Sequence, residues 1–153
     1  MGRRTNLLPC IECVKYPLPE FGGLYVKNIH LIRDTEANQY RFLPSHIISD
    51  AVLCVAYSQP ETTTQGQLEY QYKIKTLKKI EAMLNIFLTQ GHKNIVLGAW
   101  GCGAFGNPPE EMAQLFRQVL LSPNYQGRFQ HVVFAIHKDT WHLNLQAFEK
   151  VLG

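Results

Sequence analysis

Two kinds of apolar segment alternate along this chain from residue 49 onward, and the alternation limits the folds open to it. Short continuous apolar stretches are typical of buried strands, and they occupy residues 49–58, 94–100 and 129–136. Apolar residues at helical spacing are typical of amphipathic helices, and they occupy residues 67–90, 112–120 and 141–152. Such a strand–helix alternation predicts an α/β fold with parallel strands joined by helical crossovers.

The amino-terminal segment follows this alternation poorly. Residues 1–23 combine three prolines with a Gly-Gly pair and show no regular pattern. Residues 24–34 are rich in Val, Ile and Tyr, which favours one strand or a short hairpin. A length of 153 residues suits one domain. We therefore predict a single domain over 1–153, with a divergent and partly irregular segment at 1–45 and an α/β core at 46–153.

Composition and charge narrow the class of protein. The chain is 46% hydrophobic and 18% charged, as expected of a folded domain. Its net charge of +3 is small for a protein that binds duplex nucleic acid. No stretch reaches the ~18 apolar residues of a membrane span, and Pro9, Glu12 and Lys15 interrupt any secretion signal. These features predict a cytoplasmic protein whose partners include neither a membrane nor duplex nucleic acid.

The cysteine content indicates reduced thiols. Four cysteines are few for a disulfide framework in a chain of this length; they are Cys10, Cys13, Cys54 and Cys102. Cys10 and Cys13 form a C-x-x-C motif, but prolines follow it where a redox motif would begin a helix, and no second ligand pair has the spacing of a zinc site. We expect no metal and no cofactor, and the role of this pair stays open.

A glycine-rich stretch, GCGAFGNPP at residues 101–109, follows the second predicted strand. Taken literally, GCGAFG satisfies the G-x-G-x-x-G motif of dinucleotide-binding folds. Asn107 and two prolines follow the third glycine at once, so the helix begins too late for that motif, and no acidic residue stands about 20 positions on to hold a ribose. We expect Asn107 to be the N-cap and Pro108 the first helical residue.

This loop favours an anion site. Glycines let successive N–H groups turn to one side and form a nest, with the positive end of a helix behind it. We therefore predict that the loop binds a phosphate or diphosphate and that the ring of Phe105 contacts a sugar. The predicted site consists of Gly101, Cys102, Gly103, Ala104, Phe105, Gly106 and Asn107. The alternative is a tight turn whose glycines only allow close packing.

A family resemblance extends this prediction. The stretch NIVLGAWGCGAFGNPPEEMAQLF at 94–116, followed by HVVFAI at 131–136, resembles the carboxyl-terminal half of the microbial-type poly(ADP-ribose) glycohydrolases, a branch of the macrodomain family. The resemblance implies a three-layer α/β/α sandwich with a mostly parallel sheet, its amino-terminal part shortened or missing. It also implies that the loop wraps the diphosphate of ADP-ribose, that Phe105 orients the ribose, and that His137 lies, more loosely, on the adenosine side.

The resemblance places catalysis in a Gly-Gly-Gly run followed by Gln-Glu-Glu, which the printed sequence does not contain. Glycosidic cleavage needs a carboxylic acid at the leaving oxygen and a second group that manages the water. The catalytic residues are therefore unknown. Three hypotheses stay open: an ADP-ribose-binding protein without the catalytic carboxylates, a working hydrolase completed by another chain or by Glu20 or Glu61, and an interaction protein with an empty loop.

The expected partners follow from these hypotheses. The ligand is ADP-ribose or an ADP-ribosylated protein or polymer. An incomplete sheet leaves strand edges that a partner usually covers, so we expect a homo-oligomer or a complementing chain. Cys102 beside a helix N-terminus is a setting that lowers a thiol's pKa. With His137 as its base, it would be a weaker candidate nucleophile.

Overall fold

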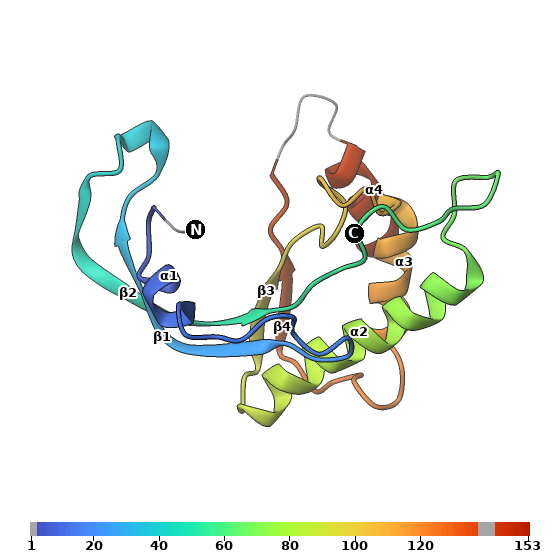
Figure 1. Cartoon of the computed structure of the whole chain (residues 1–153), viewed down its shortest axis with the longest axis horizontal. Helices are drawn as coiled ribbons and strands as arrows, with labels where there is room; N and C mark the ends of the chain where they lie inside the picture. The colour runs from blue at the N-terminus through green and yellow to red at the C-terminus, as the bar shows by residue number, and fades with distance from the viewer. Residues whose placement is uncertain (1–2, 138–142) are drawn as a thin grey trace. The chain divides into compact units, whose positions relative to one another are not determined.

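The computed structural model describes residues 3–137 and 143–153, which belong to two compact units (Figure 1). The first unit contains Met1–Pro19 and Gly23–Cys54, and the second contains Glu20–Gly22 and Val55–Gly153. An antiparallel hairpin forms most of the first unit. A parallel pair of strands with three helices forms most of the second.

The hairpin of the first unit consists of β1 (Leu24–Arg33) and β2 (Phe42–Leu53), joined through a short 3-10 turn, η1 (Glu36–Asn38). The register shifts near Asn28, which has a φ of 54° and whose N–H donates to the carboxylate of Asp50 at 2.9 Å. The left-handed conformation therefore has a side-chain acceptor to hold it. The strand predicted at 24–34 is confirmed.

A short helix, α1 (Leu7–Ile11), covers one face of β1. Its Leu7 is buried together with Val26 and Ile29 of the strand, and these three side chains form the core of the first unit. Residues 1–23, which carry no regular sequence pattern, thus contribute one helical turn and one core residue. Cys10 and Cys13 lie on and just after this helix with exposed thiols.

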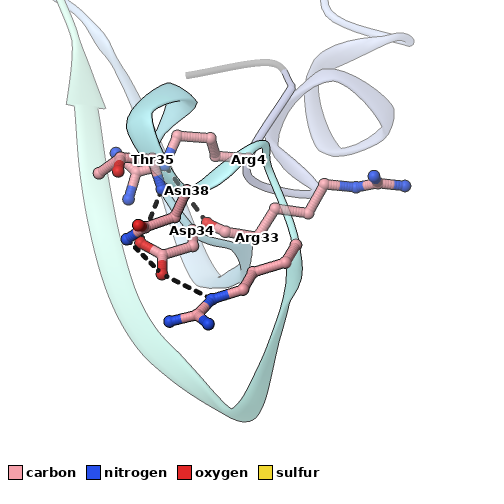
Figure 2. A network of polar contacts seen from close by, with 6 residues as sticks. Arg4, Arg33, Asp34, Thr35 and Asn38 are labelled. Carbon is pink, nitrogen blue, oxygen red and sulfur yellow. Dashed lines mark hydrogen bonds and ion pairs between the residues drawn. The ribbon is translucent and has the colours of Figure 1, made fainter.

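The hairpin tip is organised by one carboxylate (Figure 2). Asp34 accepts hydrogen bonds from the N–H of Thr35 at 2.7 Å and from Nδ2 of Asn38 at 2.9 Å, and it forms an ion pair with Arg41 at 3.4 Å. These donors, the Thr35 N–H foremost, hold the pKa of Asp34 below its ordinary value. The carboxylate is therefore ionised at neutral pH and ties both ends of the turn together.

The second unit has the strand–helix alternation that the sequence predicts. Its elements are α2 (Tyr70–Thr89), β3 (Asn94–Leu97), α3 (Pro109–Leu120), β4 (His131–Phe134) and α4 (Leu143–Leu152). Strands β3 and β4 pair in parallel with α3 as the crossover between them, and α3 packs against both α2 and α4 (Figure 1). The helix predicted over 67–90 is confirmed and ends before Gly91, whose φ is +82°.

The core of the second unit forms where α3 meets the strands. Four of the five residues in the predicted apolar stripe of α3 are buried, namely Met112, Leu115, Phe116 and Val119, and the fifth, Leu120, is half-buried. Phe116 is fully buried and makes edge contacts with Trp100 and Phe134, and Phe134 in turn contacts Phe148 of α4. This row of rings connects the loop after β3 to the last helix. Trp141, predicted to begin the stripe of that helix, lies outside the described residues.

The buried strand predicted at 49–58 is wrong in its bounds, its pairing and its burial, since Ala56 is the one buried residue among 49–58. Strand β2 runs from residue 42 to 53 and is antiparallel to β1, while residues 54–58 form no strand. In this segment, side chains make hydrogen bonds to backbone carbonyl groups that a neighbouring strand would otherwise bind. The carbonyl of Val55 accepts from Lys79 Nζ at 3.2 Å, and that of Tyr57 accepts from Asn107 Nδ2 at 2.8 Å. The described strands thus form one antiparallel and one parallel pair, so the mostly parallel sheet is borne out only for β3 and β4.

Within residues 3–137 and 143–153, no helix combines the length and the apolar character required to cross a bilayer.

Candidate functional site

The glycine loop leaves the sheet at the carboxyl ends of the parallel strands. The N–H of Ala135 donates to the carbonyl of Leu97 at 2.7 Å, so the two chains stay paired one residue beyond β4. The loop then runs from Gly98 to Pro108 and enters α3. In α/β folds this edge of the sheet is where ligands bind.

The carbonyl groups of the loop are occupied by internal hydrogen bonds. Gly101 O accepts from the backbone and side-chain amides of Asn107, both at 3.0 Å, and Gly103 O accepts from the Gly106 N–H at 2.9 Å. Ala104 O accepts from Gln59 Nε2 at 3.0 Å, and Phe105 O accepts from the Gln59 N–H at 2.8 Å. Four carbonyl groups of the loop are therefore already bonded within the protein.

Three consecutive amides of the same loop remain unused. In the part of the chain that the structure describes, the N–H groups of Gly103, Ala104 and Phe105 donate no hydrogen bond, and all three residues are exposed. The ring of Phe105 is 38% exposed. A surface of free donors beside used acceptors is suited to an anion and unsuited to a cation.

Asn107 holds the loop closed from inside. Its side chain is 2% exposed, and Nδ2 donates to the carbonyls of Tyr57, Gly101 and Phe105 at 2.8, 3.0 and 3.3 Å. Its Oδ1 is buried and has no partner among the described residues. The prediction that Asn107 is the N-cap is wrong by one residue, since the cap is Pro108 and α3 begins at Pro109. Asn107 does not cap the helix, because its Oδ1, the atom that would accept from the first turn of α3, makes no hydrogen bond there while its Nδ2 binds the loop carbonyls.

The three glycines of the GCGAFG stretch have different roles. Gly101 and Gly106 have φ values of +79° and +66°, which side-chain-bearing residues rarely adopt. A Cβ on Gly101 would also stand 2.8 Å from the Cβ of Ala56. Gly103 has neither constraint: its φ is not positive, and a Cβ there would meet nothing within 4 Å. Only Gly103 can therefore accept a side chain without a local structural penalty.

Cys102 contradicts the sequence prediction for its thiol. Burial raises its pKa to about 12 instead of lowering it, and Sγ lies 3.6 Å from the carbonyl of Trp100. Burial disfavours the charged thiolate, and α3 begins only at Pro109, seven residues after Cys102. His137 follows β4, is exposed, and makes no hydrogen bond or ring contact with the loop within the described ranges. Its predicted place beside the adenosine stays a prediction.

We expect Cys102 to resist alkylation. At pH 8 a thiol with a pKa of about 12 is roughly one part in ten thousand thiolate, and only the thiolate reacts. Iodoacetamide should therefore modify the exposed Cys10 and Cys13 at least about 100-fold faster than Cys102, as followed by peptide mass spectrometry. The rate at Cys102 should rise continuously as the pH increases toward 12. Equal rates for the three thiols at pH 8 would contradict this assignment.

A second polar cluster lies next to the loop and includes Glu20. Tyr57 Oη donates to the Glu20 carboxylate at 2.5 Å, and Lys79 Nζ donates to the Glu20 carbonyl at 2.6 Å. Lys79 is 9% exposed and lies 4.6 Å from the centre of the Tyr57 ring. The Tyr57 hydrogen bond, aided by the charges of Lys75 and Lys79, holds the pKa of Glu20 below its ordinary value. The backbone carbonyl of Tyr57 also accepts a hydrogen bond from Asn107, so Tyr57 links the Glu20 carboxylate to the loop.

Two other glutamates of the second unit, Glu61 and Glu111, have structural partners. Glu61 is exposed, and its carboxylate accepts from Gln71 Nε2 at 3.4 Å. Glu111, in the first turn of α3, is buried, accepts from the Leu68 N–H at 2.5 Å and pairs with Lys73 at 3.2 Å. Of these three glutamates, Glu20 is the one whose carboxylate is linked to the loop, through the hydrogen bonds of Tyr57. Within the described ranges, no three His, Cys, Asp or Glu side chains group as metal ligands do.

Gln59 is the part of the site that sequence reasoning missed. It adopts a φ of +49° and donates two hydrogen bonds to the loop. It comes directly after the strand predicted at 49–58, and a glutamine between a serine and a proline gives no sign of contact with residues about 45 positions away. Only the tertiary structure brings Ala56, Tyr57 and Gln59 to the loop.

Comparison with known proteins gives one clear relationship. No protein-family model and no curated protein matches the sequence. Among solved structures, the poly(ADP-ribose) glycohydrolase of Deinococcus radiodurans in complex with ADP-ribose matches with a TM-score of 0.71 and 29% identity, over 84% of this chain and 51% of that one. The Thermomonospora curvata enzyme matches with a TM-score of 0.72 and 27% identity, over 84% and 46% of the two chains. This chain therefore has the mixed α/β fold of bacterial poly(ADP-ribose) glycohydrolases over most of its own length, and it spans about half of theirs.

Proposed function

We propose that this chain binds ADP-ribose and that the loop from Gly101 to Asn107 holds the diphosphate. The observation that carries the proposal is the run of three unbonded N–H groups at Gly103, Ala104 and Phe105. Phosphate oxygens accept such hydrogen bonds strongly because they are charged. The neighbouring carbonyls, which would repel the anion, are already bonded to Asn107, Gln59 and Gly106.

The charges around the loop support an anionic ligand. The amino-terminal end of α3 carries a partial positive charge toward the loop. Two acidic residues in its first turn would weaken that field, but each is paired: Glu110 with Lys150 at 2.8 Å, and Glu111 with Lys73 at 3.2 Å. The helix terminus therefore keeps its attraction for a diphosphate.

The choice of ADP-ribose among phosphorylated ligands rests on the matched structures. A Deinococcus radiodurans glycohydrolase with the same fold was solved with ADP-ribose bound. In this chain Phe105, which carries one of the free amides, has an exposed side chain that offers an apolar surface to a sugar. ADP-ribosylated proteins and polymers present the same chemical group and are proposed as the wider class of partner.

Calorimetric titration tests the proposal. We expect saturable binding of ADP-ribose and weaker binding of inorganic pyrophosphate, which has the diphosphate but lacks both riboses. Adenosine, which lacks phosphate, serves as the control and should not bind measurably. Absence of heat with millimolar ADP-ribose would reject the binding function and favour an interaction protein with an empty loop.

A working hydrolase is the second candidate, favoured by the link from Glu20 through Tyr57 to the loop. The lowered pKa of Glu20 keeps it ionised at neutral pH, which suits a base and not the acid that protonates a leaving oxygen. We therefore propose binding without hydrolysis by this chain alone. Release of ADP-ribose from polymer by the purified chain, abolished by Glu20→Gln or Glu61→Gln, would establish the hydrolase instead.

We also propose that a second copy or a complementing chain covers part of the second unit. Val96 of β3 and Val133 of β4 are register partners, so they lie side by side on one face of the parallel pair, and they are 67% and 53% exposed. Parallel sheets are usually covered on both faces, so this apolar pair is expected to have a partner. Light scattering coupled to gel filtration tests self-association: a monomer would leave only the complementing chain. A cytoplasmic location stays a prediction.

A further inference from the structure

We infer that Gln59 is a positioning residue for the anion site: it fixes the orientation of the peptide between Ala104 and Phe105 and so presents the Phe105 N–H to the ligand. The inference rests on the proposed function for its ligand, but the contacts that carry it belong to the ligand-free chain.

Two hydrogen bonds from one residue bind consecutive carbonyls of the loop. Gln59 Nε2 donates to Ala104 O at 3.0 Å, and the Gln59 N–H donates to Phe105 O at 2.8 Å. A trans peptide is planar, with its C=O and N–H on opposite sides. Because the Ala104 carbonyl points to Gln59, the N–H of Phe105 in the same peptide must point away from it. That N–H is one of the three unbonded donors.

The loop is shaped to let Gln59 approach. A Cβ on Gly106 would stand 3.0 Å from both the nitrogen and the oxygen of the Gln59 side-chain amide, closer than side chains normally pack. Gly106 has no Cβ, and its N–H closes the turn by donating to Gly103 O at 2.9 Å. The third glycine of the motif thus serves two purposes, a left-handed turn and contact with Gln59.

The backbone of Gln59 is strained. Its φ of +49° lies in the left-handed region, which costs a side-chain-bearing residue free energy and persists where surrounding contacts enforce it. If Gln59 served only to form a turn, replacing it with glycine would stabilise the chain, because glycine adopts this conformation freely. Gln59→Gly therefore separates the two roles, since it relieves the strain and removes only the side-chain hydrogen bond to Ala104.

The test compares Gln59→Gly with Gln39→Gly. Gln39 has a φ of +55° at the end of η1, in the hairpin of the first unit, so the same substitution relieves the same kind of strain at another site. We expect Gln59→Gly to melt no lower than the wild-type chain and to bind ADP-ribose about three- to tenfold more weakly, as one lost hydrogen bond predicts. Gln39→Gly should bind like the wild-type chain. Gln59→Asn, whose amide is one methylene too short, should bind like Gln59→Gly.

A ligand-free measurement keeps this inference separate from the proposed function. Amide hydrogen exchange in the ligand-free chain should become faster at Gly106 and Asn107 in Gln59→Gly and stay unchanged in Gln39→Gly. If the wild-type chain does not bind ADP-ribose but exchange changes in this way, the proposed ligand is wrong and the positioning role stands. Unchanged exchange, or undiminished affinity in a Gln59→Gly variant of a binding-competent chain, would overturn the role.

Discussion

Replacing Gly103 with leucine is expected to weaken ADP-ribose binding by about 100-fold or more, because two or three charge-assisted hydrogen bonds are blocked together. A side chain at this position would occupy open space at the exposed segment Gly103–Phe105, where the diphosphate is proposed to lie. The fold should tolerate it, since the φ of Gly103 is not positive and a Cβ would meet nothing within 4 Å. Titration calorimetry measures the affinity, and circular dichroism measures the melting temperature.

A graded variant sharpens this test. Gly103→Ala adds one methyl group and should weaken binding less than leucine, with the same unchanged melting temperature. A Gly103→Leu chain that binds ADP-ribose as tightly as the wild-type chain would show that the ligand does not use these amides. A large fall in melting temperature would instead show that Gly103 is structural.

The opposite result is expected two residues earlier, at Gly101. Gly101→Ala should destabilise the chain by about 2–4 kcal/mol, because alanine is strained at a φ of +79° and its methyl group overlaps buried atoms. The new Cβ would lie 2.8 Å from both the Cβ of Ala56 and Nδ2 of Asn107, the residue that closes the loop. For a chain of this size the melting temperature should fall by roughly 5–15 °C.

Gly66→Ala isolates the two contributions. Gly66 has nearly the same φ, +75°, but a Cβ there meets nothing within 4 Å. Its substitution should cost only the backbone strain, about 1 kcal/mol. The difference between the two variants then measures the steric overlap at Gly101. Equal losses of stability would mean that the loop relaxes around the added methyl group and that close packing does not require Gly101.

The sequence predicted those parts of the fold that depend on local periodicity. Helices α2 and α3 follow from apolar spacing, and the parallel pair β3 and β4 follows from two short apolar runs separated by a helix. The glycine loop was identifiable because its residue types are unsuited to a strand or helix. Periodicity alone could not show where the strand in the apolar run at 49–58 ends. Its backbone groups bind β1 up to residue 53 and the side chains of Lys79 and Asn107 beyond it, and both arrangements are compatible with apolar residues.

The electrostatic and positional details of the site required the structure. The sequence suggested a lowered pKa for Cys102 from its place before a helix, whereas its burial, which no local pattern shows, has the larger effect. The contact between Gln59 and Ala104 joins positions 45 residues apart and depends on the fold. The N-cap was misplaced because an asparagine at this position can either cap a helix or bind backbone carbonyls. The hydrogen bond from Asn107 to the carbonyl of Tyr57, a tertiary contact, shows that it does the second, and Pro108 is the cap.

Chemical-shift mapping of the backbone amides during titration with ADP-ribose shows whether the loop amides hold the diphosphate. The N–H signals of Gly103, Ala104 and Phe105 should move the most and become protected from hydrogen exchange at saturation. The Cys102 and Asn107 amides, already bonded to Ala99 O and Gly101 O, should change less. Saturable binding with these three amides unshifted and still exchanging freely would contradict the account, because the diphosphate would then lie elsewhere.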